Sequence, residues 1–399
     1  MHNKFVRIAI AALVAMLLAV WAGSLREPAQ TLGSGEPLVP GLAEGINEVS
    51  ALKITGASNL AIATLGRGEN GWTIAEKNGH PADVAKIREY LLKLADARVI
   101  EAKTADPNNY AKLGVEEVSA AEAKGALVEI TGLAAPVRLV IGNANTRGGE
   151  GTYVRRADEA QSLLASGSFA ADKVAANWLV RDIADIPSSR VREVSIESQG
   201  KTLRVAKDTA EEPNHRMIDI PRGREPASEF VANGLASVLS GLRFDDVLPR
   251  DAVEPGEART WQVRYAMFDG LVIDATAWEV EGKDYARFTA RLDDQVAVQH
   301  VETAQQAAVA AFEQARAEVE AANKAALEAD PKAAQVAPPE APLAVSDAAA
   351  DREQRLAALR KEAEDLEARF KGWTYVIPAF KFANMNKTSE DMLKPVAGK

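Results

Sequence analysis

The chain starts with a stretch that suits the apolar interior of a membrane. The 19 residues from Phe5 to Gly23 carry a single charge, on Arg7. As a helix they would span about 28 Å at ~1.5 Å per residue, which is close to the ~30 Å hydrocarbon core of a bilayer. Because Lys4 and Arg7 precede most of the run, the positive-inside rule keeps the N-terminus in the cytoplasm and exports the rest. We therefore expect residues 1–23 to form an N-terminal transmembrane anchor.

A cleaved signal peptide is the alternative for this stretch. The segment Val20-Trp21-Ala22 is a poor small-x-small cleavage site, because Val20 is not ideally small and Trp21 adjoins the cut. Trp21 suits the membrane interface instead, where amphipathic aromatic rings gather. The pattern favours the uncleaved anchor, and the sequence leaves open whether it is cleaved.

Composition removes several classes of function. The formal net charge is −10 and no basic stripe is visible, whereas nucleic-acid binding needs clustered Lys and Arg to displace counterions. The chain has no cysteine. This excludes disulfides, thiol catalysis, iron–sulfur clusters, cysteine-based zinc sites and a lipid-modified cysteine. We expect a chain that binds no nucleic acid.

The anchor is followed by a segment of tether-like composition and then by a folded module. Residues 24–48 are rich in Gly, Pro, Glu and Ser, which predicts a flexible tether. Residues 49–186 alternate apolar and polar side chains in several short runs, as strands do. Pro81 is expected to open one helix, whose apolar residues recur at helical spacing. The pattern predicts a first module of strands with one packed helix.

The order of these runs recurs in residues 187–298. A shift of 145 residues superposes the apolar face of the first helix, from Ile87 to Val99, on residues 232–244, so we expect Pro226 to open a second helix. The strand pair at 261–280 and the strand at 285–293 also repeat runs of the first module. A repeat of about 140 residues is too long for a solenoid unit, so we expect an internal duplication with two sister modules.

Residues 299–371 differ in character, because their apolar residues step by threes, fours or their sum along two stretches. A Pro/Ala-rich segment between the stretches cannot be helical throughout. We expect two antiparallel helices with a loose tip, the second capped by Asp347 or Ser346. Residues 372–399 would add a C-terminal strand and tail to the second module. The predicted fold class is α+β: two duplicated β-rich modules, each with one packed helix, an inserted antiparallel helical hairpin and one N-terminal transmembrane helix.

No catalytic constellation is visible among the histidines. His2, His80, His215 and His300 lie in separate segments, and none has a second ligand at a helical metal spacing. His80 stands just before a proline, where we expect a turn residue. The sequence therefore predicts no metal site.

Two further sets of residues have structural interpretations. The Gly-rich run at 143–151 is followed by a strand rather than a helix, so we expect a hairpin connection and not a phosphate loop. Trp72 and Trp373 are expected in the core or in cross-strand pairs, with a binding groove as the alternative.

Acid–base chemistry would need two carboxyl groups whose environments separate their pKa values, and a serine nucleophile would need a G-x-S-x-G elbow. We assign no catalytic or cofactor-binding role to the candidates, which are Asp182, Asp185, Ser237, Ser240, Asp245, Asp246 and Asp251.

Several motifs together resemble a known family. They are Trp72 with His80-Pro81-Ala82-Asp83, Tyr110 with Leu113-Gly114-Val115, Leu139-Val140-Ile141-Gly142, Tyr153-Val154, and Trp373-Thr374-Tyr375-Val376-Ile377-Pro378 with Met392-Leu393. With these motifs the chain resembles the bacterial envelope family called domain of unknown function 4340, over roughly residues 50–393 without the helical hairpin. The resemblance implies a protein anchored in the bacterial inner membrane, mostly periplasmic, that accompanies gliding-motility-type ABC transporters. It supplies no catalytic residues.

The leading hypothesis is a non-enzymatic accessory or scaffold subunit that works with the permease and auxiliary subunits of an ABC-type transport complex. The two modules would form a platform, and the helical hairpin would reach toward a partner. The alternative is an envelope hydrolase that acts on cell-wall glycan through a carboxylate pair about 5 to 9.5 Å apart. A third hypothesis is a passive scaffold that binds peptide strands along a sheet edge. No cofactor is expected.

Overall fold

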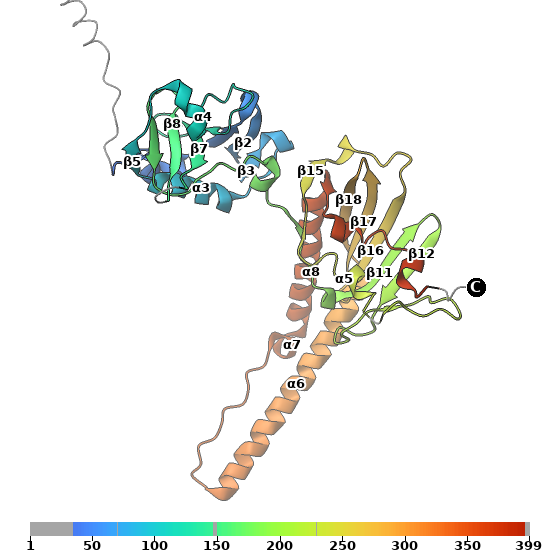
Figure 1. Cartoon of the computed structure of the whole chain (residues 1–399). Coiled ribbons are helices and arrows are strands. Elements are labelled where there is room, and N and C mark those ends of the chain that lie inside the picture. Colours follow the sequence, from blue (N-terminus) through green and yellow to red (C-terminus); the bar gives the residue numbers. More distant parts are fainter. Residues whose placement is uncertain (1–34, 70, 147–149, 229, 396–399) are drawn as a thin grey trace, which may run out of the picture. The chain divides into compact units, whose positions relative to one another are not determined.

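The computed structural model describes residues 35–69, 71–146, 150–228 and 230–395 (Figure 1). The chain forms two compact units, one up to Val180 and the other from Arg181. The predicted anchor, residues 1–23, lies outside the described residues. None of the helices in the described part is both long and apolar enough to cross a bilayer.

The first unit is built on a nine-stranded antiparallel sheet with the order β4-β3-β2-β1-β6-β7-β8-β9-β5. In β1 the buried Leu52 and Ile54 flank the exposed Lys53, which is the alternation expected of a half-buried strand. The strands are β1 (Ala51–Thr55), β2 (Ala61–Gly68), β3 (Gly71–Ile74), β4 (His80–Pro81), β5 (Val99–Ala102), β6 (Ala126–Thr131), β7 (Val137–Ala144), β8 (Thr152–Arg156) and β9 (Ser162–Ala165).

The helix predicted for this unit is present as α3 (Val84–Asp96), and the short helices α2 (Leu42–Gly45) and α4 (Tyr110–Leu113) accompany it. The apolar face of α3, including Tyr90 and Leu94, is buried. The helix does not open at Pro81, because Pro81 belongs to β4. Asp83 is the N-cap instead, and its carboxylate accepts a hydrogen bond of 3.0 Å from the amide of Lys86.

The prediction of a flexible tether over residues 24–48 is wrong for its described part. Leu38, Val39 and Leu42 are buried in the first unit. The amide of Leu38 donates a 2.9 Å hydrogen bond to the carbonyl of Ala97, at the entry to β5. The Gly and Pro content suggested a linker, but the apolar residues between them supply enough buried surface to hold the segment. The folded unit therefore begins before Val49.

The second unit contains an eight-stranded antiparallel sheet with the order β13-β12-β11-β16-β17-β18-β19-β15, and a small sheet of β10 and β14. The first sheet without β4 also has eight strands. From one edge of the sheet to the other, these strands come in the same chain order as the eight strands of the second sheet. The strands are β10 (Asp182–Ala184), β11 (Val191–Ser198), β12 (Lys201–Ala206), β13 (Arg216–Met217), β14 (Leu242–Arg243), β15 (Asp246–Pro249), β16 (Thr260–Met267), β17 (Leu271–Val280), β18 (Lys283–Leu292) and β19 (Trp373–Val376).

The second helix predicted from Pro226 is absent in the form expected. Only one turn, α5 (Asn233–Ala236), is helical. The carbonyls of Ser237, Val238 and Ser240 accept hydrogen bonds from the ammonium of Lys381 at 3.1, 2.9 and 2.6 Å, where a longer helix would supply main-chain amides. Gly234 and the serines also have low helix propensity. The apolar positions are nevertheless buried as the 145-residue shift predicted, at Ala232, Leu235, Leu239 and Phe244.

The predicted helical hairpin is confirmed and lies between β18 and β19 (Figure 1). It consists of α6 (Asp294–Ala329), the single turn α7 (Leu343–Ser346) and α8 (Ala348–Phe370), while α9 (Ala379–Phe382) follows β19. Asp347 caps α8, because its carboxylate accepts from the amide of Ala350 at 2.9 Å. We call residues 294–370 the arm, and residues 306–347 the distal arm.

The root of the arm is part of the second unit's core. Phe370 at the end of α8 is fully buried, with its ring 5.6 Å from that of Phe288 on β18. Arg190 holds α8 from outside through two hydrogen bonds to Glu362, at 2.6 and 2.8 Å, and also pairs with Asp269. The arm therefore starts from a rigid base rather than from a flexible loop.

Each unit buries one histidine, which makes stability depend on pH. Burial lowers the pKa of His80 and of His215, although the His215 ring also hydrogen-bonds the Val191 carbonyl at 2.8 Å. A histidine with a lowered folded-state pKa takes up its proton first in the unfolded state, so its stabilisation is present above about pH 6.5 and is lost as pH falls. We expect the free energy of unfolding to fall between about pH 7 and 5 in urea titrations. The double variant His80→Gln, His215→Gln should show a flatter profile, and an unchanged profile would contradict the assignment.

Candidate functional site

The first unit has a hollow of about 540 Å³ beside the start of its described chain. Three segments line it: residues 38–48 around α2, the β6–β7 connection at 133–139, and residues 156–159 after β8. Its floor is apolar, with Leu38 and Leu139 buried, while charged side chains stand around it. This combination is typical of a small-molecule or peptide site.

Two arginines at the hollow form ion pairs, whereas Glu44 and Glu48 in its lining form none among the described residues. Arg138 pairs with Glu129 at 3.1 Å and with Asp158 at 3.0 Å. Arg156 pairs with Glu159 at 3.3 Å and donates to the Leu38 carbonyl, also at 3.3 Å. The carboxylates of Asp158 and Glu159 are thus neutralised in place, an arrangement that suits binding and orientation better than proton transfer.

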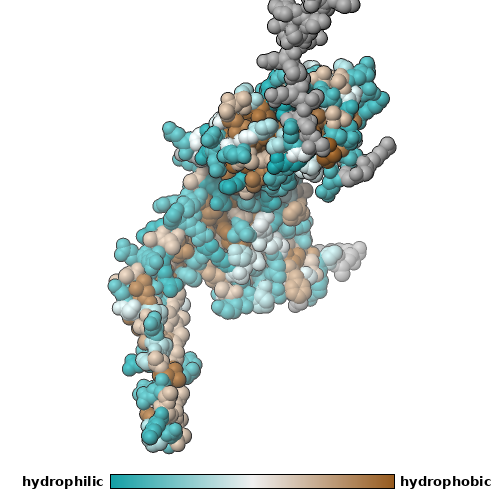
Figure 2. Space-filling model, turned by 90° about the vertical axis from the view of Figure 1, so that its left-hand side faces the viewer, coloured by the Kyte–Doolittle hydropathy of each residue, from teal (hydrophilic) through white to brown (hydrophobic). Residues whose placement is uncertain are grey.

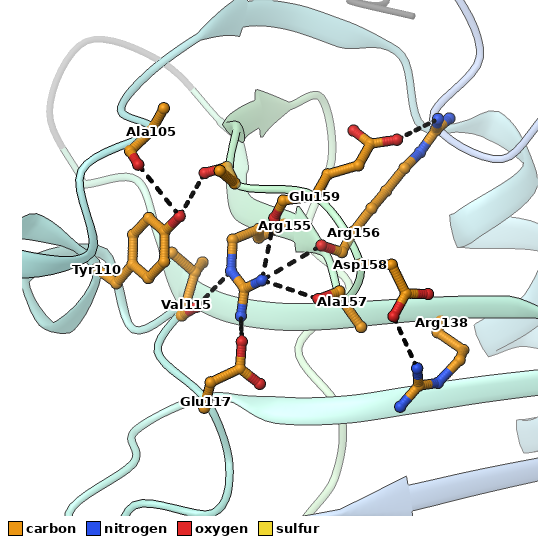
Figure 3. A network of polar contacts seen from close by, with 11 residues as sticks. Ala105, Tyr110, Val115, Glu117, Arg138, Arg155, Arg156, Ala157, Asp158 and Glu159 are labelled. Carbon is orange, nitrogen blue, oxygen red and sulfur yellow. Dashed lines mark hydrogen bonds and ion pairs between the residues drawn. The ribbon is translucent and has the colours of Figure 1, made fainter. Parts of the chain in front are cut away.

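Behind this rim lies a buried guanidinium, that of Arg155, whose side chain is only 3% exposed (Figure 3). It donates to the carbonyls of Val115 at 3.0 Å and of Ala157 and Glu159 at 3.1 Å, and pairs with Glu117 at 2.5 Å. Its charge therefore faces main-chain oxygens from two loops. Arg155 fixes the loop that carries Asp158 and Glu159.

Tyr110 completes this network. Its ring lies 4.9 Å from the Arg155 guanidinium, a cation–π contact. Its hydroxyl donates to the carbonyl of Ala160 at 2.5 Å, and the carbonyl of Ala105 lies at 3.4 Å (Figure 3). Tyr110 thereby joins the loop before α4 to the loop after β8. The loop after β8 carries Asp158 and Glu159 at the rim of the hollow.

The carboxylates singled out in the sequence all lie in the second unit. Asp182 pairs with Arg243 at 3.2 Å, and Asp245 pairs with Arg181 at 3.2 Å. Each of three others serves a local structure: Asp185 accepts from the amide of Gly241, Asp246 accepts from the amide of Val247, and Asp251 is exposed in a turn.

The remaining residues considered have the structural roles expected, except for His80. The 143–151 run connects antiparallel β7 and β8, as predicted, with residues 147–149 outside the described set. Trp72 and Trp373 lie in strands and are half-buried, in β3 and β19. His80 lies in the short strand β4 rather than in a turn. Among the described residues no group of three or more histidines and carboxylates could hold a metal ion.

The strand pattern of the sequence gives no sign that Arg155 and Arg156 have a role beyond the strand. Within β8 both Val154 and Arg155 are buried, so strand alternation alone does not mark the arginine as inward-facing. Its partners are mostly main-chain carbonyls, which leave no trace in side-chain patterns. Only the run Tyr153-Val154-Arg155-Arg156, with two arginines beside apolar residues, hinted at an unusual strand.

A second candidate surface is the distal arm. Along α6 a half-buried stripe steps by threes and fours through Ala308, Phe312, Ala315, Val319, Asn323 and Ala326. The returning chain covers it loosely. Asn323 bonds the main chain of Val336 at 2.7 and 2.8 Å, yet a hollow of about 620 Å³ remains between α6 and residues 335–338. Figure 2 shows apolar patches among hydrophilic side chains along this part of the arm.

Comparison with known proteins finds a family match for part of the chain. Residues 72–262, from β3 to β16, match the model of a family described as domain of unknown function (DUF4340). The match confirms the predicted resemblance to this family over these residues. The match includes the hollow's rim at 133–139 and 156–159 and excludes the arm. Neither a curated protein nor a solved structure matches the chain.

Proposed function

We propose that this protein is a non-enzymatic, membrane-anchored scaffold whose distal arm binds a protein partner. The observation that carries the proposal is the incomplete cover of α6. The helix has 36 residues, about 54 Å at ~1.5 Å per residue. Its hydrogen bonds to the start of α8 are at Gln305, which donates to the Ala348 carbonyl at 2.7 Å. More than half of α6 therefore extends past its helical neighbour.

The returning chain covers α6 only loosely, so it contributes little to the stability of the helix. A binding role accounts for the length of α6. Leu327, Val336 and Leu343 on the distal arm are exposed by 36%, 60% and 42%. Apolar groups on a projecting element, rimmed by polar residues, are typical of protein-binding surfaces. Alanines on the stripe allow another helix to approach closely, as they do in helix-in-groove recognition.

Charge indicates the chemistry of the partner surface. The distal arm has seven acidic and three basic residues. A partner with a basic rim around an apolar strip would be steered toward it, whereas a second copy of the same surface would be repelled. A partner of that kind among the permease or auxiliary subunits of an ABC-type complex is consistent with the leading hypothesis.

We also infer an internal duplication and a periplasmic location for both units. The duplication is supported by eight strands that follow the same connection order in each sheet. The location is supported by the apolar run from Phe5 to Gly23 after Lys4. On this proposal the two units are copies of one module. The second copy carries the arm as an insertion, and the first copy has the arginine-rimmed hollow. The hydrolase alternative gains no support from the ion-paired carboxylates of that hollow.

Deleting residues 308–346 should abolish partner binding without unfolding the second unit. Gln305 and Ala348 are in contact, so a four-residue Gly/Ser linker can close the gap. The cut leaves the core residues Leu366 and Phe370 in place. Affinity purification from solubilised membranes with mass spectrometry should recover ATPase and permease subunits with the full chain and lose them with the truncated one.

Point variants provide a matched control for the truncation. Val319→Asp and Leu327→Asp place charge on the loosely covered face and should reduce recovery as the truncation does. Ala317→Asp and Ala321→Asp add the same charge at exposed positions elsewhere on α6 and should not. Equal recovery of the same subunits with the truncated chain would overturn the arm's role.

A further inference from the structure

A pocket of about 360 Å³ in the second unit has a cationic lining that the acidic character of the chain does not lead one to expect. It lies between the β11–β12 turn, the residue before β16, and the segment that leads to the 3-10 turn Glu390–Met392. The cations are Lys201 at the start of β12, Arg259 before β16 and Lys387 from the C-terminal segment. Three segments far apart in sequence thus bring positive charge to one place.

Two of these cations lack carboxylate partners. Within the described ranges, neither Lys201 nor Lys387 forms an ion pair or a hydrogen bond through its ammonium group. By contrast, most arginines of the unit are paired, as Arg204 is with Glu193 at 3.0 Å. Unpaired cations that converge on a concave surface raise the local potential and attract anions.

The third cation is held in place by the fold. The Arg259 guanidinium donates through Nε to the hydroxyl of Ser198 at 2.9 Å, and Ser198 in turn donates to the Thr260 carbonyl at 2.7 Å. The guanidinium also lies 5.0 Å from the ring of Trp261. Its terminal nitrogens have no carboxylate partner in the described part of the chain. Arg259 is therefore oriented without a salt bridge, and its charge is only partly offset by the nearby carboxylate of Asp391.

Two carboxylates belong to this region, Glu390 in the lining and Asp391 next to it, and Asp391 interacts electrostatically with Lys387 and Arg259. Glu390 is held by Arg224 at 3.0 Å. Asp391 accepts hydrogen bonds from the amide and hydroxyl of Thr388 at 2.8 and 2.7 Å. Hydroxyl groups of Thr202 and Ser389 add neutral donors to the lining. The pocket therefore offers three cations and several hydroxyls to one ligand.

We propose that this pocket binds a phosphate-bearing anion through Lys201, Arg259 and Lys387. Ammonium and guanidinium groups with hydroxyl donors are the groups that recognise phosphate oxygens. The volume admits a diphosphate or a phosphorylated headgroup. Such a group can come from a soluble phosphorylated compound or from an anionic lipid, and both present the same phosphate oxygens.

The test measures binding of two probes to the full chain in detergent. Inorganic pyrophosphate, followed by calorimetry, represents the soluble source, and phosphatidylglycerol nanodiscs, compared with phosphatidylcholine ones, represent the lipid. The double variant Lys201→Gln, Lys387→Gln should lower the affinity for the probe that binds at least tenfold. Neither lysine forms a salt bridge within the described ranges, so the fold should survive, as its thermal transition would verify.

The matched control removes the same charge from the distal arm, with Lys324→Gln and Lys332→Gln. It should leave affinity for either probe unchanged. Pyrophosphate binding identifies a soluble ligand, and a preference for phosphatidylglycerol alone identifies a lipid headgroup. The proposal is overturned if the wild-type chain binds neither probe, or if the control variant loses as much affinity as the pocket variant.

Discussion

Replacing Arg155 by methionine is expected to lower the free energy of unfolding of the first unit by about 3 kcal/mol. The methionine keeps most of the apolar stem but removes donors from the carbonyls of Val115, Ala157 and Glu159. A buried acceptor left without a partner costs about 1–3 kcal/mol. Urea denaturation followed by the fluorescence of Trp178, which is buried in the same unit, would measure the change.

The matched control is Arg138→Met, which also removes a guanidinium from the rim of the hollow. The Arg138 side chain is 42% exposed, and exposed ion pairs contribute roughly 0–1 kcal/mol. We expect a loss below about 1 kcal/mol. Equal losses of stability in the two variants would contradict the large contribution that we assign to the network around Arg155.

Phe370→Ala should destabilise the second unit by about 3–5 kcal/mol, the range typical of a buried phenylalanine truncated to alanine. The side chain is fully buried at the root of the arm and packs against Phe288. The alanine would leave a cavity under α8 and weaken the base from which the arm projects. Thermal denaturation followed by near-ultraviolet circular dichroism would record the loss.

Phe312→Ala, on the distal arm, makes the same chemical change in a loosely covered place. Because Phe312 is only half-buried, its truncation should cost far less stability than that of Phe370. On the proposed function it should instead weaken partner recovery. A large loss of stability from Phe312→Ala would mean that the distal arm is a cooperative part of the second unit's core.

Elements with a strong periodic pattern were predictable from the sequence. The spacing of Ile87, Tyr90 and Leu94 gave α3, and the alternation around β1 gave a strand. The two stepped apolar stretches, with Asp347 before the second, gave the antiparallel helices and their cap. In each case one face of one element carries the information, so a local pattern suffices.

Features that depend on contacts between distant segments were not predictable. The burial of Leu38 and Leu42 depends on a surface formed around β5, and the missing second helix depends on Lys381, which lies 141 to 144 residues away from the carbonyls it bonds. The Arg155 network and the cationic pocket likewise join segments that share no local signal. The family match, over residues 72–262, includes the Arg155 network but leaves out Leu38, Leu42, Lys381 and Lys387.

The insertion point of the arm has a mechanical consequence. α8 leads through Lys371 and Gly372 into β19, which pairs with β18 at only two positions, Tyr285 with Val376 and Ala286 with Tyr375. A sideways pull on the far end of α6 acts on the base of the arm over roughly 50 Å. Torque applied by whatever grips the tip thus enters the sheet through β18 and β19, and β19 passes its share on to β15, with which it pairs at four positions.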